Sequence, residues 1–126
     1  MPYVPATEAL NEAFVDVWRL RDQMGATPWR AALVGTPGVR VVLLGWPPGY
    51  ATVPHVHPHA EEVFLVLQGR AAFSIGNEPE RDVGPGQFML AERGERHGIR
   101  VPLDGEPLVL LAAVVPNEDA PDETIE

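Results

Sequence analysis

Glycine and proline interrupt this chain too often for it to fold mainly as helices. The 126 residues include 12 glycines and 14 prolines, and from residue 29 onward these separate short apolar runs. Short apolar runs bounded by such turn residues are typical of antiparallel strands. The expected strands are Trp29–Val34, Val39–Gly45, Ala51–His57, Glu62–Gln68, Ala71–Ile75, Gln87–Ala91, Arg96–Val101 and Leu108–Val115. Eight strands at this spacing favour an all-β antiparallel barrel or sandwich.

The first part of the chain has a different periodicity. Apolar side chains recur there at helical spacing, which predicts an amphipathic helix over Thr7–Met24. Thr7 would cap its first turn, and Gly25 follows its last residue. The apolar stripe consists of Leu10, Ala13, Phe14 and Val17, widened by Trp18. We therefore expect a helical segment over residues 1–28, one barrel domain over residues 29–115, and an acidic tail over residues 116–126.

The charged residues of the chain exclude several functions. The formal net charge is −9, from 9 basic and 18 acidic residues. Because such a chain repels a phosphate backbone, a nucleic acid partner is not expected. The basic residues are all arginine, and there is no cysteine. Schiff-base chemistry on lysine, thiolate metal sites, disulfides and cysteine nucleophiles are thereby excluded.

The end of the chain is its most acidic part. Five of the 18 acidic residues lie in the last ten positions, which predicts a tail that is disordered or loosely draped. No apolar run approaches the ~20 residues that a membrane span needs, and the opening residues lack a secretory pattern. The sequence thus predicts a cytoplasmic protein with no membrane partner.

The histidines and carboxylates that could bind a metal are concentrated in residues 49–69, which read GYATVPHVHPHAEEVFLVLQG. If its first part is extended, His55 and His57 point to the same face, because side chains alternate along a strand. A turn at residues 58–60 then returns the chain and brings Glu62 close to the two imidazoles. Two imidazoles and a carboxylate that converge on one point are typical ligands of a divalent transition metal. His59 and Glu61 are rival ligands in the same stretch.

This stretch resembles the first motif of the cupin superfamily. That motif is a glycine, five residues, His-x-His, three or four residues, a glutamate, six residues and a second glycine. The matching residues are Gly49, His55, His57, Glu62 and Gly69. Every position of the motif is therefore filled, with four residues between the second histidine and the glutamate.

A downstream segment resembles the second cupin motif, which is a glycine, five residues, Pro-x-Gly, two residues, a histidine, three residues and an asparagine. Gly86, Gly94 and His97 match it, whereas Glu92 replaces the proline and Val101 replaces the asparagine. The two departures affect the turn and the strand end and leave the histidine in place. If His97 points inward on its strand, alternation places Val101 inward as well.

The resemblance implies a small double-stranded β-helix of the cupin or jelly-roll type, with one metal inside it. The ligands that it implies are His55, His57, Glu62 and His97. It favours Glu62 over Glu61, because only Glu62 leaves six residues before the second glycine. His59 lies past Pro58, where the strand should break. Iron, manganese, nickel, copper and zinc are all compatible with three imidazoles and one carboxylate.

Four protein ligands leave coordination positions open for Lewis-acid, water-activating or oxygen-binding chemistry. One hypothesis is a metal-dependent enzyme of the dioxygenase or isomerase type that acts on a small metabolite. The other is a non-enzymatic module that binds or senses a small molecule. The sequence has no HExxH, GxSxG, phosphate-loop or GxGxxG motif, and Glu92 is the only further acid–base candidate. The candidate residues of the site's mouth are Trp46, Tyr50, Met89, Trp29 and Arg30.

The strand that begins at Glu62 is apolar on both faces. Its outward positions are Val63, Leu65 and Leu67, which alternate with the inward Glu62, Phe64 and Val66. An apolar outer face must be covered by something, either the N-terminal helix or a second subunit. We expect a homodimer, which is common among the small cupins that the chain resembles.

Overall fold

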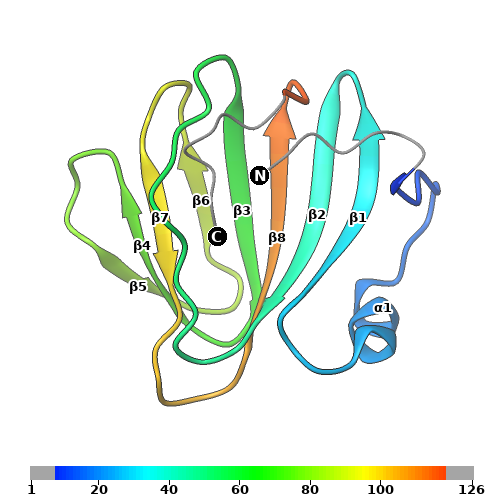
Figure 1. Cartoon of the computed structure of the whole chain (residues 1–126), viewed down its shortest axis with the longest axis horizontal. Coiled ribbons are helices and arrows are strands. Elements are labelled where there is room, and N and C mark those ends of the chain that lie inside the picture. The colour runs from blue at the N-terminus through cyan, green and yellow to red at the C-terminus, as the bar shows by residue number, and fades with distance from the viewer. Residues whose placement is uncertain (1–7, 119–126) are drawn as a thin grey trace.

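A computed structural model describes residues 8–118 of the chain. Those residues form one helix and eight strands (Figure 1). The elements are α1 (Val17–Met24), β1 (Trp29–Thr36), β2 (Val39–Trp46), β3 (Glu61–Gln68), β4 (Ala71–Ile75), β5 (Arg81–Val83), β6 (Phe88–Ala91), β7 (His97–Arg100) and β8 (Leu108–Val115). The helix is too short and too polar to cross a membrane, and the described residues contain no other helix that could do so.

The strands form two antiparallel sheets that pack against each other (Figure 1). The larger sheet has the order β1-β2-β8-β3-β6, and the smaller has the order β5-β4-β7. The chain leaves the larger sheet twice, for β4 and β5 and again for β7, and returns each time. The last strand, β8, lies between β2 and β3. This is the double-stranded β-helix that the sequence resemblance implies, and it confirms the predicted all-β fold.

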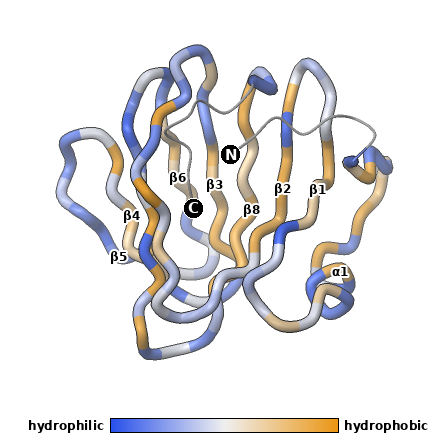
Figure 2. The backbone as a smooth tube through the Cα atoms, in the orientation of Figure 1, coloured by the Kyte–Doolittle hydropathy of each residue, from blue (hydrophilic) through white to orange (hydrophobic). Residues whose placement is uncertain are grey.

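The main core lies between the two sheets. It is built from the inward positions of strands that alternate in burial, such as Glu62, Phe64 and Val66 on β3. Residues from both sheets share it, including Leu110 from the larger sheet and Ile99 from the smaller. Figure 2 shows runs of hydrophobic residues along β2, β8 and β3. Removal of this apolar surface from water is the main driving force that stabilises such a fold.

A second core lies on the outer face of the larger sheet. Leu33, Leu43 and Val109 are buried there, and Val17 and Leu20 of α1 pack against them. Because α1 covers this face, β2 is buried on both faces over most of its length. The helix thus covers part of the outer sheet surface, one of the two solutions that the sequence left open.

The helix begins ten residues later than predicted. Asp16 is its N-cap, and its carboxylate accepts hydrogen bonds from the backbone N–H groups of Trp18 and Arg19 at 3.1 and 3.2 Å. The backbone N–H groups of Leu10 and Asn11 donate instead to carbonyls of β1 at 3.1 and 2.9 Å. The expected stripe was therefore wrong in its first half, because this segment follows the sheet edge. The predicted cap Thr7 lies outside the described residues.

One predicted strand needs correction, and one observed strand was not predicted. Residues 51–57 form only two isolated bridges, and no continuous ladder, since Pro54 lacks the N–H group that a ladder requires. The strand β5 was missed because its Arg81 and Asp82 are exposed and only Val83 is buried. With one buried residue in three, the sequence shows no alternation of polar and apolar residues that would predict a strand.

Part of the predicted tail is held by the barrel. The side-chain amide of Asn117 donates to the carbonyl of Thr36 at 2.9 Å, and the carboxylate of Glu118 accepts from the backbone N–H of His59 at 3.1 Å. Residues 119–126, which carry most of the predicted acidic tail, lie outside the described residues.

Candidate metal centre

A pair of backbone hydrogen bonds sets two histidines side by side. The N–H of His55 donates to the carbonyl of His97 at 3.0 Å, and the N–H of His97 donates back at 2.9 Å. This isolated antiparallel bridge joins the 51–57 segment to β7. The two ring centroids lie 4.4 Å apart, and the two Nε2 atoms lie 3.1 Å apart. Neighbours in the bridge thus become neighbours in the site.

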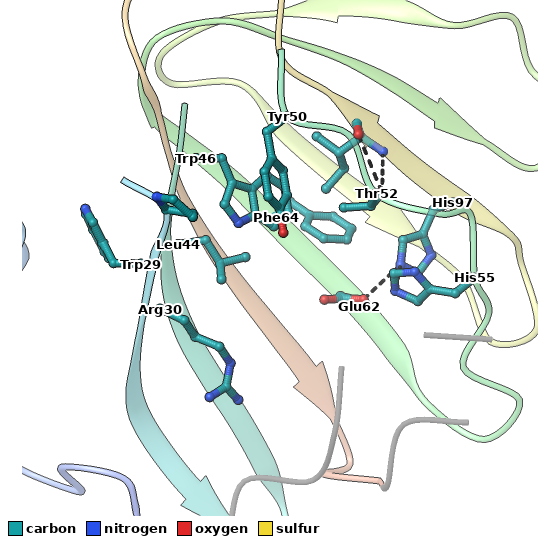
Figure 3. A pocket seen from close by; sticks show the side chains of 12 residues that line it. Trp29, Arg30, Leu44, Trp46, Tyr50, Thr52, His55, Glu62, Phe64 and His97 are labelled. Atoms are coloured by element: carbon teal, nitrogen blue, oxygen red, sulfur yellow. Dashed lines mark hydrogen bonds and ion pairs between the residues drawn. The ribbon is translucent and has the colours of Figure 1, made fainter. Parts of the chain in front are cut away.

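Glu62 reaches the same point from the opposite sheet (Figure 3). One carboxylate oxygen, Oε1, lies 3.0 Å from Nε2 of His57 and 3.0 Å from Nε2 of His97. The side chains of these three residues are each 2 % exposed. With His55 they form a group of four buried residues whose ligand atoms all lie within 4.8 Å of one another. This group could bind a metal ion.

Glycines on both sides of the stretch permit this geometry. Gly49 and Gly69 both have a left-handed φ, of 87° and 81°, which side chains rarely adopt. A Cβ on Gly69 would also overlap the carbonyl of Pro107. The turn before β7 is also fixed to the first histidine segment, because the N–H of Gly94 donates to the carbonyl of His57 at 2.9 Å.

The donor atoms fit a cation better than they fit one another. Nδ1 of His55 lies 3.2 Å from the carbonyl of Val53, and Nδ1 of His97 lies 3.4 Å from the carbonyl of Glu95. A carbonyl only accepts, so Nδ1 carries the proton in both rings and Nε2 presents a lone pair to the centre. Two lone pairs and the Glu62 carboxylate then face one another, and a cation among them removes their repulsion.

The third imidazole is held differently. Nδ1 of His57 is buried and has no hydrogen-bond partner among the described residues. Its orientation therefore depends on Nε2, which faces Glu62.

Burial tunes the protonation of the site. Loss of water around His55, together with the adjacent His97, lowers the pKa of His55 to about 4. Burial alone would raise the pKa of Glu62, but the adjacent His57 and His97 imidazoles outweigh it and hold that pKa well below its usual range. At neutral pH the site therefore presents a neutral His55 imidazole and an ionised carboxylate, which are the forms that bind metals.

We expect the metal-free protein to lose stability as the pH falls from about 6.5 to about 4. His55 takes up a proton near pH 6.5 when unfolded but only near pH 4 when folded. Protons therefore favour the unfolded chain in this window, by up to about 3 kcal/mol at its acid end. Urea unfolding with a chelator present measures this effect. The His55→Gln variant should lack this contribution, and an equal loss in that variant would contradict the assignment.

The rival ligands lie outside the group. His59 and Glu61 are both exposed, and Glu61 opposes Val115 at the outer end of β3. Glu92 is exposed in the 92–95 turn, where its N–H donates to the carboxylate of Glu95 at 3.0 Å. The sequence prediction for Met89 at the mouth was wrong, because Met89 is not among the residues that line the cavity beside the site.

A cavity of about 390 Å³ opens beside His55, Glu62 and His97 (Figure 3). Its lining consists of Pro28, Trp29, Arg30, Leu44, Trp46, Tyr50, Thr52, His55, Glu62, Phe64, His97 and Ile99. Trp46 and Tyr50 stack with their ring centroids 4.7 Å apart. Sequence reasoning missed Leu44 and Thr52 as lining residues. Leu44 could have been found, because it shares the strand parity of Trp46.

Solved structures with this fold resemble the chain over most of its length. An uncharacterized conserved protein with a double-stranded beta-helix domain from Klebsiella pneumoniae superposes with a TM-score of 0.73 and 25% identity. The match covers 86% of this chain and 88% of that one. A chain from the crystal structures of the DMSP lyases RdDddP and RnDddQII matches with 27% identity and a TM-score of 0.60, over 68% of this chain and 46% of that one.

Two sequence comparisons point the same way. Dimethylsulfoniopropionate lyase DddQ from Ruegeria pomeroyi is 39% identical over 46 residues, which are 36% of this chain and only 22% of that lyase. The family model described as the Cupin domain matches residues 42–114. That span is more than half of the chain and contains all four residues of the candidate metal centre, so the protein belongs to the cupin family.

Proposed function

We propose that His55, His57, Glu62 and His97 together hold one divalent transition metal. The observation that supports this most is the convergence of two unprotonated imidazole nitrogens and an ionised carboxylate at 3.0–3.1 Å. All four residues are buried, so water screens their repulsion poorly. Iron, manganese, nickel, copper and zinc each suit these donors.

We further propose that the protein is a metal-dependent enzyme that acts on a small metabolite in the adjacent cavity. A metal bound here would supply Lewis-acid or redox chemistry at positions that the four side chains leave open. The described lining contains no carboxylate or imidazole beyond the ligands themselves. The chain's own side chains would therefore bind and orient the substrate, exclude water from the aromatic wall, and keep Glu62 ionised.

The reaction class has three candidates. Dioxygenase-like and isomerase-like chemistry follow from the open coordination positions. A lyase reaction is favoured by the similarity to dimethylsulfoniopropionate lyase DddQ and to the chain from the DMSP lyase structures. A non-enzymatic binding or sensing role uses the same cavity without turnover, and fold alone does not separate these possibilities.

Elemental analysis of protein purified without chelator tests the proposal first. About one equivalent of a transition metal per chain is expected, and a chain that stays metal-free when supplied with each candidate metal would refute it. The loaded protein is then screened for oxygen uptake and for elimination from small organic acids. Turnover supports the enzyme, whereas a co-purified small molecule without turnover supports the binding module.

We also propose that the protein is a homodimer that uses the outer face of β3 and β6. Val63 opposes Leu90, and Leu65 opposes Phe88, so four apolar side chains are adjacent on this face. Phe88 is 63% exposed and Leu90 is 43% exposed. The second core under α1 includes none of these four residues, so the helix leaves this patch uncovered. An exposed apolar patch of this kind is typical of an interface.

The Phe88→Glu variant is expected to convert the dimer to a monomer in sedimentation velocity at micromolar concentration. A two-fold interface would place two copies of the new charge close together in a desolvated patch. Phe14→Glu introduces the same change at another exposed phenylalanine, outside the patch, and should leave the dimer intact. A monomeric wild type would show that the patch does not mediate self-association.

A further inference from the structure

We propose that Arg30 makes the cavity a site for small organic carboxylates, held with the carboxylate on the guanidinium and the rest of the molecule directed toward the metal centre. This inference rests on the proposed function, since it names the substrate class of the same cavity. It follows from the position of Arg30, from the charges that line the cavity, and from the apolar surface between the two polar ends.

Strand register places Arg30 over the cavity. Arg30 opposes Leu44 across the β1–β2 pair, and Leu44 is buried in the main core and lines the cavity. Opposed residues of two antiparallel strands project from the same face, so Arg30 projects from the inner face of β1. The start of β1 is fixed by Trp29, whose ring occupies the space that a side chain on Gly45 would need. Arg30 is therefore attached to a braced strand, which holds its backbone in place.

The cavity differs in charge from the rest of the molecule. The chain carries a net charge of −9, yet the ionised groups among the described lining residues are Arg30 and Glu62. Glu62 is committed to His57 and His97. Without a metal the two charges cancel, and a divalent ion would make the lining net positive by two. With a divalent ion bound, the cavity would therefore attract an anion, although the chain as a whole carries a net negative charge.

The surface between the two polar ends is apolar. Figure 3 shows Arg30 on the opposite side of the cavity from His55 and His97, with Leu44 and Phe64 along one wall and Glu62 nearer the histidines. The stacked Trp46 and Tyr50 form a further aromatic wall. A guanidinium has five N–H donors and pairs with a carboxylate through two of them, so the others remain for contacts with the protein. The ligand that matches is a carboxylate with an aliphatic or planar body.

The first test uses metal-free protein, freed of chelator by gel filtration, so that the result depends on Arg30 and not on a metal. The probes are 3-phenylpropanoate and 3-phenylpropanamide, which differ in charge and share their shape, and calorimetry measures both affinities. Wild type is expected to bind the acid at least tenfold more tightly than the amide. Arg30→Gln should abolish that preference, and Arg30→Lys should retain only part of it, because an ammonium lacks the two-pronged geometry.

The control is Arg81→Gln, which removes the same charge from an exposed position on β5 that is not part of this cavity. It should keep the tenfold preference. A preference that survives in Arg30→Gln, or is absent in wild type, overturns the inference. Since this test needs no metal, failure of the metal proposal leaves it readable. In metal-loaded protein, a dicarboxylate from the series malonate to adipate should bind more tightly than its half-amide, and Arg30→Gln should remove the difference.

Discussion

The His97→Ala variant is expected to retain almost no metal, whereas wild type should carry about one ion per chain. His97 lies 3.0–3.1 Å from both Glu62 and His55, so its removal takes away one ligand and the bridge between two others. A ligand that binds only the folded state adds about 2.7 kcal/mol when its concentration is 100 times its Kd. The variant should lose this increment, which corresponds to a fall in Tm on the order of 10 °C. Elemental analysis and thermal melts with and without chelator measure both effects.

The matched control is His59→Ala. His59 is exposed, and the hydrogen bond that it makes within the described residues runs from its backbone N–H to Glu118, which alanine can also make. It should keep full metal content and a Tm that the chelator lowers as in wild type. Equal metal in His97→Ala and wild type would refute the four-ligand centre. Loss of metal in His59→Ala would mean that the residues of the 57–62 turn that bind the metal are assigned incorrectly.

Phe64→Ala is expected to destabilise the metal-free protein by about 3–5 kcal/mol. Phe64 is 2% exposed, and its ring meets Phe73 and His97 edge-on, with centroids 5.2 and 5.4 Å apart. Truncation of a buried phenylalanine removes apolar contacts and leaves a cavity, and both effects destabilise the folded state. Urea unfolding with a chelator present separates the effect of packing from that of metal binding.

Phe14→Ala serves as the control, because Phe14 is 92% exposed. Its free energy of unfolding should lie within about 0.5 kcal/mol of wild type, as for most surface substitutions. A loss of less than about 1 kcal/mol for Phe64→Ala would mean that the interior between the sheets is not packed as described. Phe64 also lines the cavity beside His97, so the same variant should bind metal less tightly in a parallel titration.

The alternation of side chains along extended segments predicted part of the candidate site from the sequence. His55 and His57 are two residues apart on an extended segment, so they share a face whether or not that segment joins a ladder. Glu62 follows the turn at the inward parity of β3. The preference for Glu62 over Glu61 came from the spacing of the family motif, because only Glu62 leaves six residues before Gly69. The contribution of His97 came from the resemblance to a family motif, because the bridge that joins it to His55 spans 42 residues and leaves no local pattern.

The errors arose where tertiary contacts override local preference. Leu10 and Phe14 have helical spacing with Val17, but the earlier part of this segment donates hydrogen bonds to the edge of β1. The spacing of apolar residues indicates which side chains could share a helix face. It does not predict whether the backbone N–H groups of the segment will donate to its own carbonyls or to those of a neighbouring strand. Arg30 was noted only as a candidate at the mouth, since its inward orientation depends on the register between β1 and β2.

The segment that follows the edge of β1 covers part of a sheet edge that would otherwise be open. A sheet edge offers unpaired N–H and C=O groups that can template the addition of foreign strands. Leu10 and Asn11 occupy two carbonyls of that edge, and the Asn11 side chain accepts from the N–H of Gly35 at 2.9 Å. This short stretch thus covers part of the β1 edge of the larger sheet. A proteolytic cut between it and α1 would spare the barrel's strands and the metal centre, and would still leave a molecule able to polymerise edge to edge.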